Sequence, residues 1–142
     1  MRIEITEFIE VAHCLLDTNQ LHTKECANLH GHTYQVKVKI SSERENFSDV
    51  SSSMLIDFKQ IKDIIRILDH TVILPSQYEN LGTEIKKVTG QPIVYLPNPT
   101  AEAISFAILD EIKNRIGDLP IQVELVEGYK GNNSNKVICR SK

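Results

Sequence analysis

Tyr34-Gln-Val-Lys-Val-Lys-Ile40 carries the clearest strand pattern in the sequence. Its apolar residues occupy every second position, and glutamine or lysine fills the positions between them. Because successive side chains of a strand point to opposite faces, this pattern predicts a strand with one buried and one wet face. Such strict alternation is typical of an antiparallel sheet that is covered on one side only.

Further strands are expected on both sides of this stretch. Residues 2–9 are predicted to form one of them, with Ile3, Ile5 and Phe8 on the buried side. Residues 121–127 alternate between apolar and polar side chains in the same way. Shorter strands are expected at residues 54–56, 93–96 and 137–140.

Two long helices are predicted between the strands. Asp57 is expected to cap a helix that runs to about Leu68, and Thr100 a second helix over residues 101–116. Residues 79–89 are a candidate for a short helix. The positions expected on the buried helix faces are Phe58, Ile61, Ile64, Ile65 and Leu68 in the first long helix and Ile104, Ile108 and Ile112 in the second. This order of elements predicts an α+β fold, with a four-stranded antiparallel sheet and two helices on one face.

The bulk composition excludes several classes of function. With 142 residues, 41% of them hydrophobic, the chain is expected to form a single domain over residues 1–142. A net charge of −3, without a cluster of lysine and arginine, argues against a nucleic-acid partner. No apolar run approaches the roughly 20 residues of a membrane helix, so no membrane partner is expected.

The cysteines indicate the cellular compartment of the protein, and the sheet edges indicate its oligomeric state. Cys14, Cys26 and Cys139 are odd in number and lack CxxC spacing, which argues against a disulfide framework and for a reducing compartment. The N-terminus has no signal-peptide pattern, so a cytoplasmic location is expected. The edges of a four-stranded sheet can be protected by continuing the sheet into a neighbouring subunit, which favours a homo-oligomer.

His30-Gly-His32 is the most informative short motif. Side chains two positions apart share one face of a strand, so the two imidazoles would lie side by side. Neutral imidazole is a zinc ligand, and catalytic zinc sites combine three protein ligands with an open position. His13, at the end of the first strand, is the stronger candidate for a third ligand, and His22, in a polar loop, is the weaker one. The alternative is a polar pair on the solvent face of a strand.

Cys26 lies four residues before His30, and three roles are open for its thiol. It can be a fourth zinc ligand, a reactive acid/base or nucleophile favoured by a nearby metal, or a buried apolar residue. Cys14 and Cys139 lie in apolar or terminal strand surroundings, where burial is the simpler interpretation.

Five further residues each have a possible chemical role and a plainer structural one. Asp69 can orient His70 as a general base, although an Asp-His pair at a helix end is more often a surface pair. Glu127 can accept two hydrogen bonds from a ring edge such as that of a pterin or a guanine, or it is a solvated carboxylate. Thr100 and Glu102 fit first as helix-capping residues.

Taken together, these elements resemble the family of 6-pyruvoyl-tetrahydropterin synthases and 6-carboxytetrahydropterin synthases over nearly the whole chain. The combination is specific, whereas each element alone is not. The matching elements, in the order of that family, are Phe8-x4-His13, Cys26-x3-His30-Gly-His32-x-Tyr34, Ile56-Asp57-Phe58, Leu68-Asp69-His70, Asn98-Pro99-Thr100-Ala101-Glu102 and the strand ending in Glu127.

The resemblance implies the tunnelling fold, in which subunit sheets join into a barrel and two trimers stack into a hexamer with active sites between subunits. It implies zinc as the cofactor and a pterin triphosphate as the substrate. The residues that it assigns are His13, His30 and His32 to zinc, Cys26, Asp69 and His70 to proton transfer, and Glu127, Thr100 and Glu102 to the pterin ring.

The short spacing from Cys26 to His30 is similar to that of bacterial 6-carboxytetrahydropterin synthases of the queuosine (7-deazaguanine) pathway. The implied reaction converts 7,8-dihydroneopterin triphosphate to 6-carboxy-5,6,7,8-tetrahydropterin, acetaldehyde and triphosphate. The alternatives are a triphosphate lyase that stops at the 6-pyruvoyl product and a non-catalytic zinc- or pterin-binding subunit. Residues 71–97 and 130–135 are longer than in the short bacterial forms and are expected to border the site.

Overall fold

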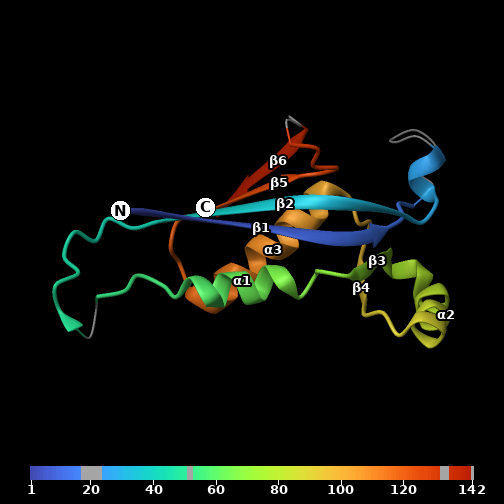
Figure 1. Cartoon of the computed structure of the whole chain (residues 1–142), viewed down its shortest axis with the longest axis horizontal. Helices are drawn as coiled ribbons and strands as arrows, with labels where there is room; N and C mark the ends of the chain where they lie inside the picture. Colours follow the sequence, from blue (N-terminus) through green and yellow to red (C-terminus); the bar gives the residue numbers. More distant parts are fainter. Residues whose placement is uncertain (17–23, 51–52, 132–134, 142) are drawn as a thin grey trace.

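The computed structural model describes residues 1–16, 24–50, 53–131 and 135–141. Its centre is a six-stranded mixed sheet with the strand order β4-β3-β1-β2-β5-β6 (Figure 1). The strands are β1 (Arg2–His13), β2 (His30–Ser41), β3 (Thr71–Pro75), β4 (Ile93–Leu96), β5 (Ile121–Val126) and β6 (Lys136–Arg140). The helices are α1 (Phe58–Arg66), α2 (Glu79–Thr89) and α3 (Ala101–Ile116), with short 3-10 turns η1 (Lys24–Ala27) and η3 (Ser76–Tyr78).

The long antiparallel pair β1–β2 forms the middle of the sheet. The two strands are paired along their whole length, from Arg2 opposite Ser41 to His13 opposite His30. The predicted alternation of β2 is confirmed, since its even-numbered residues from 34 to 40 are fully buried. On the outer side of β2, β5 and β6 continue the antiparallel order.

The helices α1 and α3 cover one face of this sheet, as predicted (Figure 1). Asp57 caps α1 by accepting a hydrogen bond from the backbone N–H of Lys59, and Thr100 caps α3 by accepting one from that of Ala103. The predicted start of each helix is therefore confirmed. The buried isoleucines of the two helices join the strand residues in one core, and Phe58, expected in that core, is 52% exposed.

The sheet has six strands rather than the predicted four, and it is mixed rather than antiparallel. The strand β3 runs parallel to both of its neighbours, β1 and β4. All five of its residues, Thr71 to Pro75, are buried. A strand that is covered on both faces loses the period-two pattern, which is why alternation did not reveal it. Residues 54–56, expected as a strand, form none.

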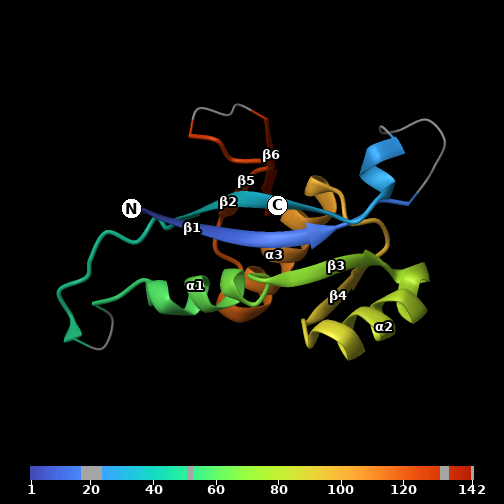
Figure 2. The same ribbon diagram turned by 45° about the vertical axis from the view of Figure 1, so that its right-hand side comes forward.

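The helix α2 covers β3 and β4 on the face opposite α1 and α3. Val72 and Leu74 pack with Ile85 of α2 in a second small core, whereas Ile73, which lies between them, belongs to the main core. Figure 2 shows β3 and β4 side by side with α2 against them. The prediction of two helices on one face is therefore incomplete, because a third helix covers the other face.

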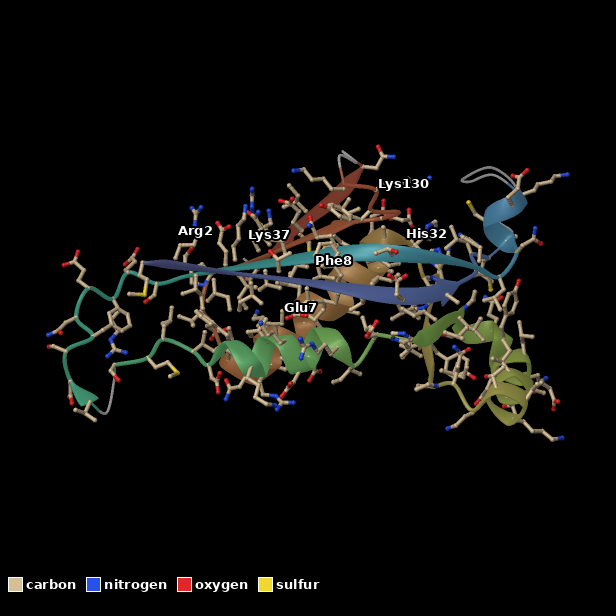
Figure 3. The ribbon with its side chains drawn as sticks, viewed as in Figure 1. Arg2, Glu7, Phe8, His32, Lys37 and Lys130 are labelled. Carbon is tan, nitrogen blue, oxygen red and sulfur yellow. The ribbon has the colours of Figure 1, made fainter. Side chains whose placement is uncertain are left out.

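The remaining open face of the sheet is polar and carries one aromatic pair. Phe8, expected in the core, is 49% exposed and packs against Tyr129 with ring centroids 5.1 Å apart. The position on the helix face belongs instead to Glu7, which forms an ion pair with Arg66 at 3.2 Å. In Figure 3, Glu7 lies between β1 and α1, whereas Arg2 projects from the other side of the sheet.

Within the described ranges, the three α-helices are too short or too polar to cross a membrane.

Candidate active site

Three histidines converge where β1 ends and β2 begins. The antiparallel register places His13 directly opposite His30, and His32 follows two residues later on the same face. The ring centroids lie 4.6 Å apart for His13 and His30, 5.2 Å for His13 and His32, and 4.9 Å for His30 and His32. One ligand atom of each lies within 4.8 Å of the other two. The predicted trio is therefore brought together, while His22, the weaker alternative, lies outside the described residues.

The outer nitrogens of two of these rings are held by backbone carbonyls. Nδ1 of His13 lies 2.8 Å from the carbonyl oxygen of Pro99, and Nδ1 of His30 lies 2.7 Å from that of Asn28. A carbonyl oxygen only accepts, so each Nδ1 carries the proton and each Nε2 keeps its lone pair. Ligating histidines in metal sites are oriented by the same kind of contact.

The residues present fit a metal ion. Nε2 of His13 is buried and has no hydrogen-bond partner, which is costly for a polar atom unless an ion occupies the space in front of it. Burial lowers the pKa of His13 below its ordinary value, although the contact with Pro99 opposes this. Burial also lowers the pKa of His32, against the opposing effect of Glu127. Neutral imidazoles are the form that binds zinc.

Glu127 follows β5 directly and lies beside the histidine cluster. Its Oε1 accepts a hydrogen bond from the hydroxyl of Tyr34 at 2.8 Å. The same oxygen lies 3.7 Å from Nε2 of His13 and 3.7 Å from Nε2 of His32. Burial, together with the charge of Glu127, raises the pKa of Tyr34, so the phenol remains a hydrogen-bond donor. Glu127 is thus next to the histidine cluster and not a separate solvated strand end.

A cavity of about 530 Å³ opens beside Glu127. His13, Cys26, Thr100, Glu102 and Glu127 all line it. The half-buried Cys26 lies in the turn η1, and its carbonyl oxygen accepts a hydrogen bond from the backbone N–H of Leu15, which ties this turn to the end of β1. Sequence positions as distant as Cys26 and Glu127 therefore share one cavity with a metal-ligand candidate.

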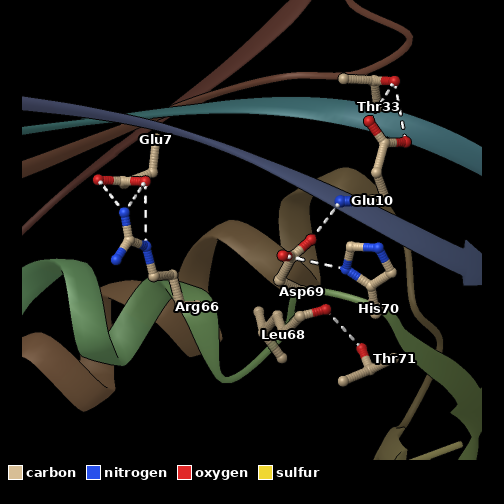
Figure 4. A network of polar contacts seen from close by, with 8 residues as sticks. All are labelled: Glu7, Glu10, Thr33, Arg66, Leu68, Asp69, His70 and Thr71. Atoms are coloured by element: carbon tan, nitrogen blue, oxygen red, sulfur yellow. Dashed lines mark hydrogen bonds and ion pairs between the residues drawn. The ribbon is translucent and has the colours of Figure 1, made fainter.

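Asp69 and His70 form a polar pair at the edge of β1. Oδ2 of Asp69 lies 3.0 Å from Nδ1 of His70, and its Oδ1 accepts a hydrogen bond from the backbone N–H of Glu10 (Figure 4). The backbone of His70 has a φ of 58°, a left-handed conformation that is unusual for a residue other than glycine. Burial alone would raise the pKa of Asp69, but the hydrogen bonds from Glu10 and His70 outweigh it and lower the pKa.

The structure does not bring all of the predicted acid/base residues into one cavity. His70 lines a second hollow of about 320 Å³, together with His32 and Gly31. Cys26 lines the first cavity and not the second. Within one chain the two groups expected to transfer protons thus line different spaces.

The roles of three residues at this site were not predicted from the sequence. Tyr34 looked like an ordinary core residue of an alternating strand. The carbonyl oxygen of Pro99 holds His13, and Asn98 accepts a hydrogen bond from the backbone N–H of Leu16 at 3.0 Å. The three residues belong to the matched motifs His-x-Tyr and Asn-Pro-Thr, which were the available signal, but a backbone carbonyl leaves no mark in a sequence.

An α+β fold with three converging histidines and a cavity lined by a cysteine and carboxylates defines a protein with a candidate metal site beside a cavity. The sequence model of the family described as 6-pyruvoyl tetrahydropterin synthase matches residues 2–141. The chain belongs to the 6-pyruvoyl tetrahydropterin synthase family.

Two curated relatives share the name 6-carboxy-5,6,7,8-tetrahydropterin synthase. The protein from Rickettsia felis is 35% identical in an alignment 97 residues long that covers 64% of this chain and 67% of that relative. The protein from Haemophilus influenzae is 32% identical in an alignment 101 residues long that covers 66% of this chain and 71% of that relative.

The fold has solved counterparts. The structure of 6-pyruvoyl tetrahydropterin synthase from Plasmodium falciparum matches with a TM-score of 0.65, covering 99% of this chain and 97% of that one. The two chains are 20% identical, so this likeness supports the fold alone.

Proposed function

We propose that this protein is a zinc-dependent lyase that converts 7,8-dihydroneopterin triphosphate to 6-carboxy-5,6,7,8-tetrahydropterin, acetaldehyde and triphosphate. The observation that carries the proposal is the cavity in which His13, Cys26 and Glu127 meet. The family and the names of the relatives from Rickettsia felis and Haemophilus influenzae support the pterin substrate and favour the carboxy product.

His13, His30 and His32 would hold the zinc ion, because one ring nitrogen of each lies within 4.8 Å of those of the other two. When bound, zinc would polarise oxygens of the substrate side chain and make the neighbouring C–H groups more acidic.

Glu127 would anchor the pterin ring. A carboxylate can accept hydrogen bonds from the adjacent N–H and NH₂ groups of that ring in a paired geometry. Thr100 and Glu102 line the same cavity at the N-terminus of α3 and would border the bound ring.

Cys26 would remove and return protons at the substrate side chain, because its thiol group lies in a segment that lines the cavity. Asp69 would orient His70 as the second acid/base group, through the 3.0 Å contact between them. Since His70 faces a different hollow from Cys26, the complete site would form between subunits of a homo-oligomer, for which a hexamer of two stacked trimers is our proposal.

The test is to incubate the zinc-loaded protein with 7,8-dihydroneopterin triphosphate and to identify the products by mass spectrometry. Release of acetaldehyde with 6-carboxytetrahydropterin is the expected result. Formation of the 6-pyruvoyl product would assign the protein to the other branch of the family. Unchanged substrate together with tight pterin binding would overturn the enzymatic proposal in favour of a binding subunit.

A further inference from the structure

The carboxylate of Glu127 lies near both the histidine cluster and the cavity, and it is hydrogen-bonded to Tyr34. Oε1 accepts the hydrogen bond from the Tyr34 hydroxyl at 2.8 Å and lies 3.7 Å from Nε2 of both His13 and His32. The distances to the imidazoles are too long for hydrogen bonds. The bond from Tyr34 is therefore what orients this carboxylate in the part of the chain that the structure describes.

A metal ion in the histidine cluster would attract this carboxylate. Four ligands at about 2.0–2.1 Å around a tetrahedral ion lie about 3.4 Å from one another. Oε1 is only slightly farther than this from two of the three candidate ligand nitrogens. In the described residues, however, the group of potential ligands within 4.8 Å of one another comprises His13, His30 and His32 alone. Glu127 thus lies beside the cluster rather than within it, close enough to become a fourth ligand.

Binding of the Glu127 carboxylate to the metal would impair the site in two ways. It would fill the open position that distinguishes a catalytic metal site from a structural one. It would also commit an oxygen that the pterin ring needs as a hydrogen-bond acceptor. Oε1, by contrast, can accept from Tyr34 and still offer a second lone pair to a ligand in the cavity.

Tyr34 is well placed to hold the carboxylate. Its side chain is fully buried in β2, two residues after His32, so its hydroxyl has a fixed direction. Glu127 lies just beyond β5, and its side chain is 37% exposed, so it keeps freedom to rotate. The buried Tyr34 side chain therefore sets the position of the more exposed Glu127 side chain.

We propose that Tyr34 is a positioning residue that keeps the Glu127 carboxylate off the metal and directed to the pterin ring. The metal part of this inference stands on the three-histidine cluster, whereas the pterin part rests on the proposed function. A purely structural role is the competing explanation, in which Glu127 merely satisfies the buried hydroxyl of Tyr34.

The two explanations predict different changes in the affinities of the Tyr34→Phe variant for zinc and for pterin. If Tyr34 restrains Glu127, its loss lets the carboxylate reach the metal, so zinc binds roughly 10-fold more tightly while pterin binds roughly 10-fold more weakly. If the role is only structural, loosening of the site weakens both ligands together. The measurements are competition for zinc against a chromophoric chelator and fluorescence titration of the zinc-loaded protein with neopterin.

Two further variants complete the experiment. Tyr129→Phe removes a hydroxyl from the open face of the sheet, where Tyr129 packs against Phe8, and is expected to leave both affinities unchanged. In the background of Glu127→Gln, Tyr34→Phe is expected to change the zinc affinity no further, because the two residues act as a unit.

The crystal structure of the zinc-loaded Tyr34→Phe variant provides a direct check, with an oxygen of Glu127 expected on the metal. Parallel loss of both affinities, or no change in either, overturns the inference. Absence of neopterin binding to the wild-type protein would instead contradict the proposed function, while the zinc measurement would still decide the metal part.

Discussion

Cys26 and the three histidines are candidates for two different roles, proton transfer and metal binding. The thiol lies in η1, outside the sheet, whereas the histidines are fixed on paired strands. Among the described residues the close ligand group contains the histidines and not Cys26, so the role of fourth zinc ligand is not supported by proximity. Proton transfer at the substrate is the role that the shared cavity favours.

The Cys26→Ala variant is expected to lose turnover by about 10²–10⁴-fold, the usual contribution of one acid/base group. Its zinc affinity should stay unchanged, because the cluster of His13, His30 and His32 remains complete. Steady-state kinetics and chelator competition measure the two quantities. Cys139→Ala, which alters a buried thiol in β6, is the control and should retain full turnover. Full activity of Cys26→Ala would contradict the assignment.

The lowered pKa of Asp69 predicts that the fold becomes less stable at acid pH. Its folded-state pKa lies below the ordinary value of 3.8, because hydrogen bonds from Glu10 and His70 outweigh the effect of burial. A lowered carboxyl pKa stabilises the fold above the ordinary pKa, and this contribution disappears as the pH falls through the lowered value. Urea unfolding should therefore show Asp69→Asn to be less stable than wild type at pH 7, with a smaller difference near pH 3. An equal difference at both pH values would contradict this.

Among the elements of the fold, the segment from residue 98 to residue 100 joins α3 to the histidine cluster. Asn98 holds the chain after β1, the carbonyl oxygen of Pro99 holds His13, and Thr100 caps α3. The start of this helix and the orientation of a metal-ligand candidate therefore depend on the same three residues.

Removal of the cap in Thr100→Ala is expected to lower the free energy of unfolding by about 1 kcal/mol. Thr100→Ser retains the accepting oxygen and should behave like wild type. Because Pro99 precedes the cap, the alanine variant should also bind zinc less tightly, by up to roughly 10-fold. Chemical denaturation and chelator competition test the two effects, and equal losses in the serine and alanine variants would argue against a capping role.

For the molecule as a whole, the separation of Cys26 from His70 bears on whether the protein forms oligomers. The two residues line different cavities of one chain, although both are needed in the proposed reaction. The sheet also ends in two strands, β4 and β6, that have one neighbour each. An oligomer in which one subunit supplies Cys26 and the next supplies His70 would complete the site.

Two inactive variants should therefore complement each other. When Cys26→Ala and His70→Ala subunits are mixed, dissociated and reassembled, up to about a quarter of the sites in random oligomers would contain both native residues. The recovered activity should approach that fraction, whereas each variant alone stays inactive. Light scattering gives the oligomeric state of the same samples. A mixture without activity would place both groups in one subunit.

Elements whose signals are local could be predicted from the amino-acid sequence alone. The alternation of residues 34–40 predicted β2, because one face of that strand meets the core and the other meets water. Asp57 and Thr100 marked the helix starts, since capping depends on residues within one turn. The spacing of His30 and His32 placed two imidazoles on one face, and the antiparallel neighbour brought His13 beside them as predicted.

Features that depend on what covers each face of the sheet could not be predicted before the chain was seen folded. β3 has no alternation because the main core lies on one side of it and α2 on the other, so its sequence gives no period to detect. Phe8 is exposed and Glu7 partly buried because the register of β1, and not hydrophobicity, decides which residues face α1. The bond from Tyr34 to Glu127 joins residues 93 positions apart, and such a contact exists only once the strands have paired.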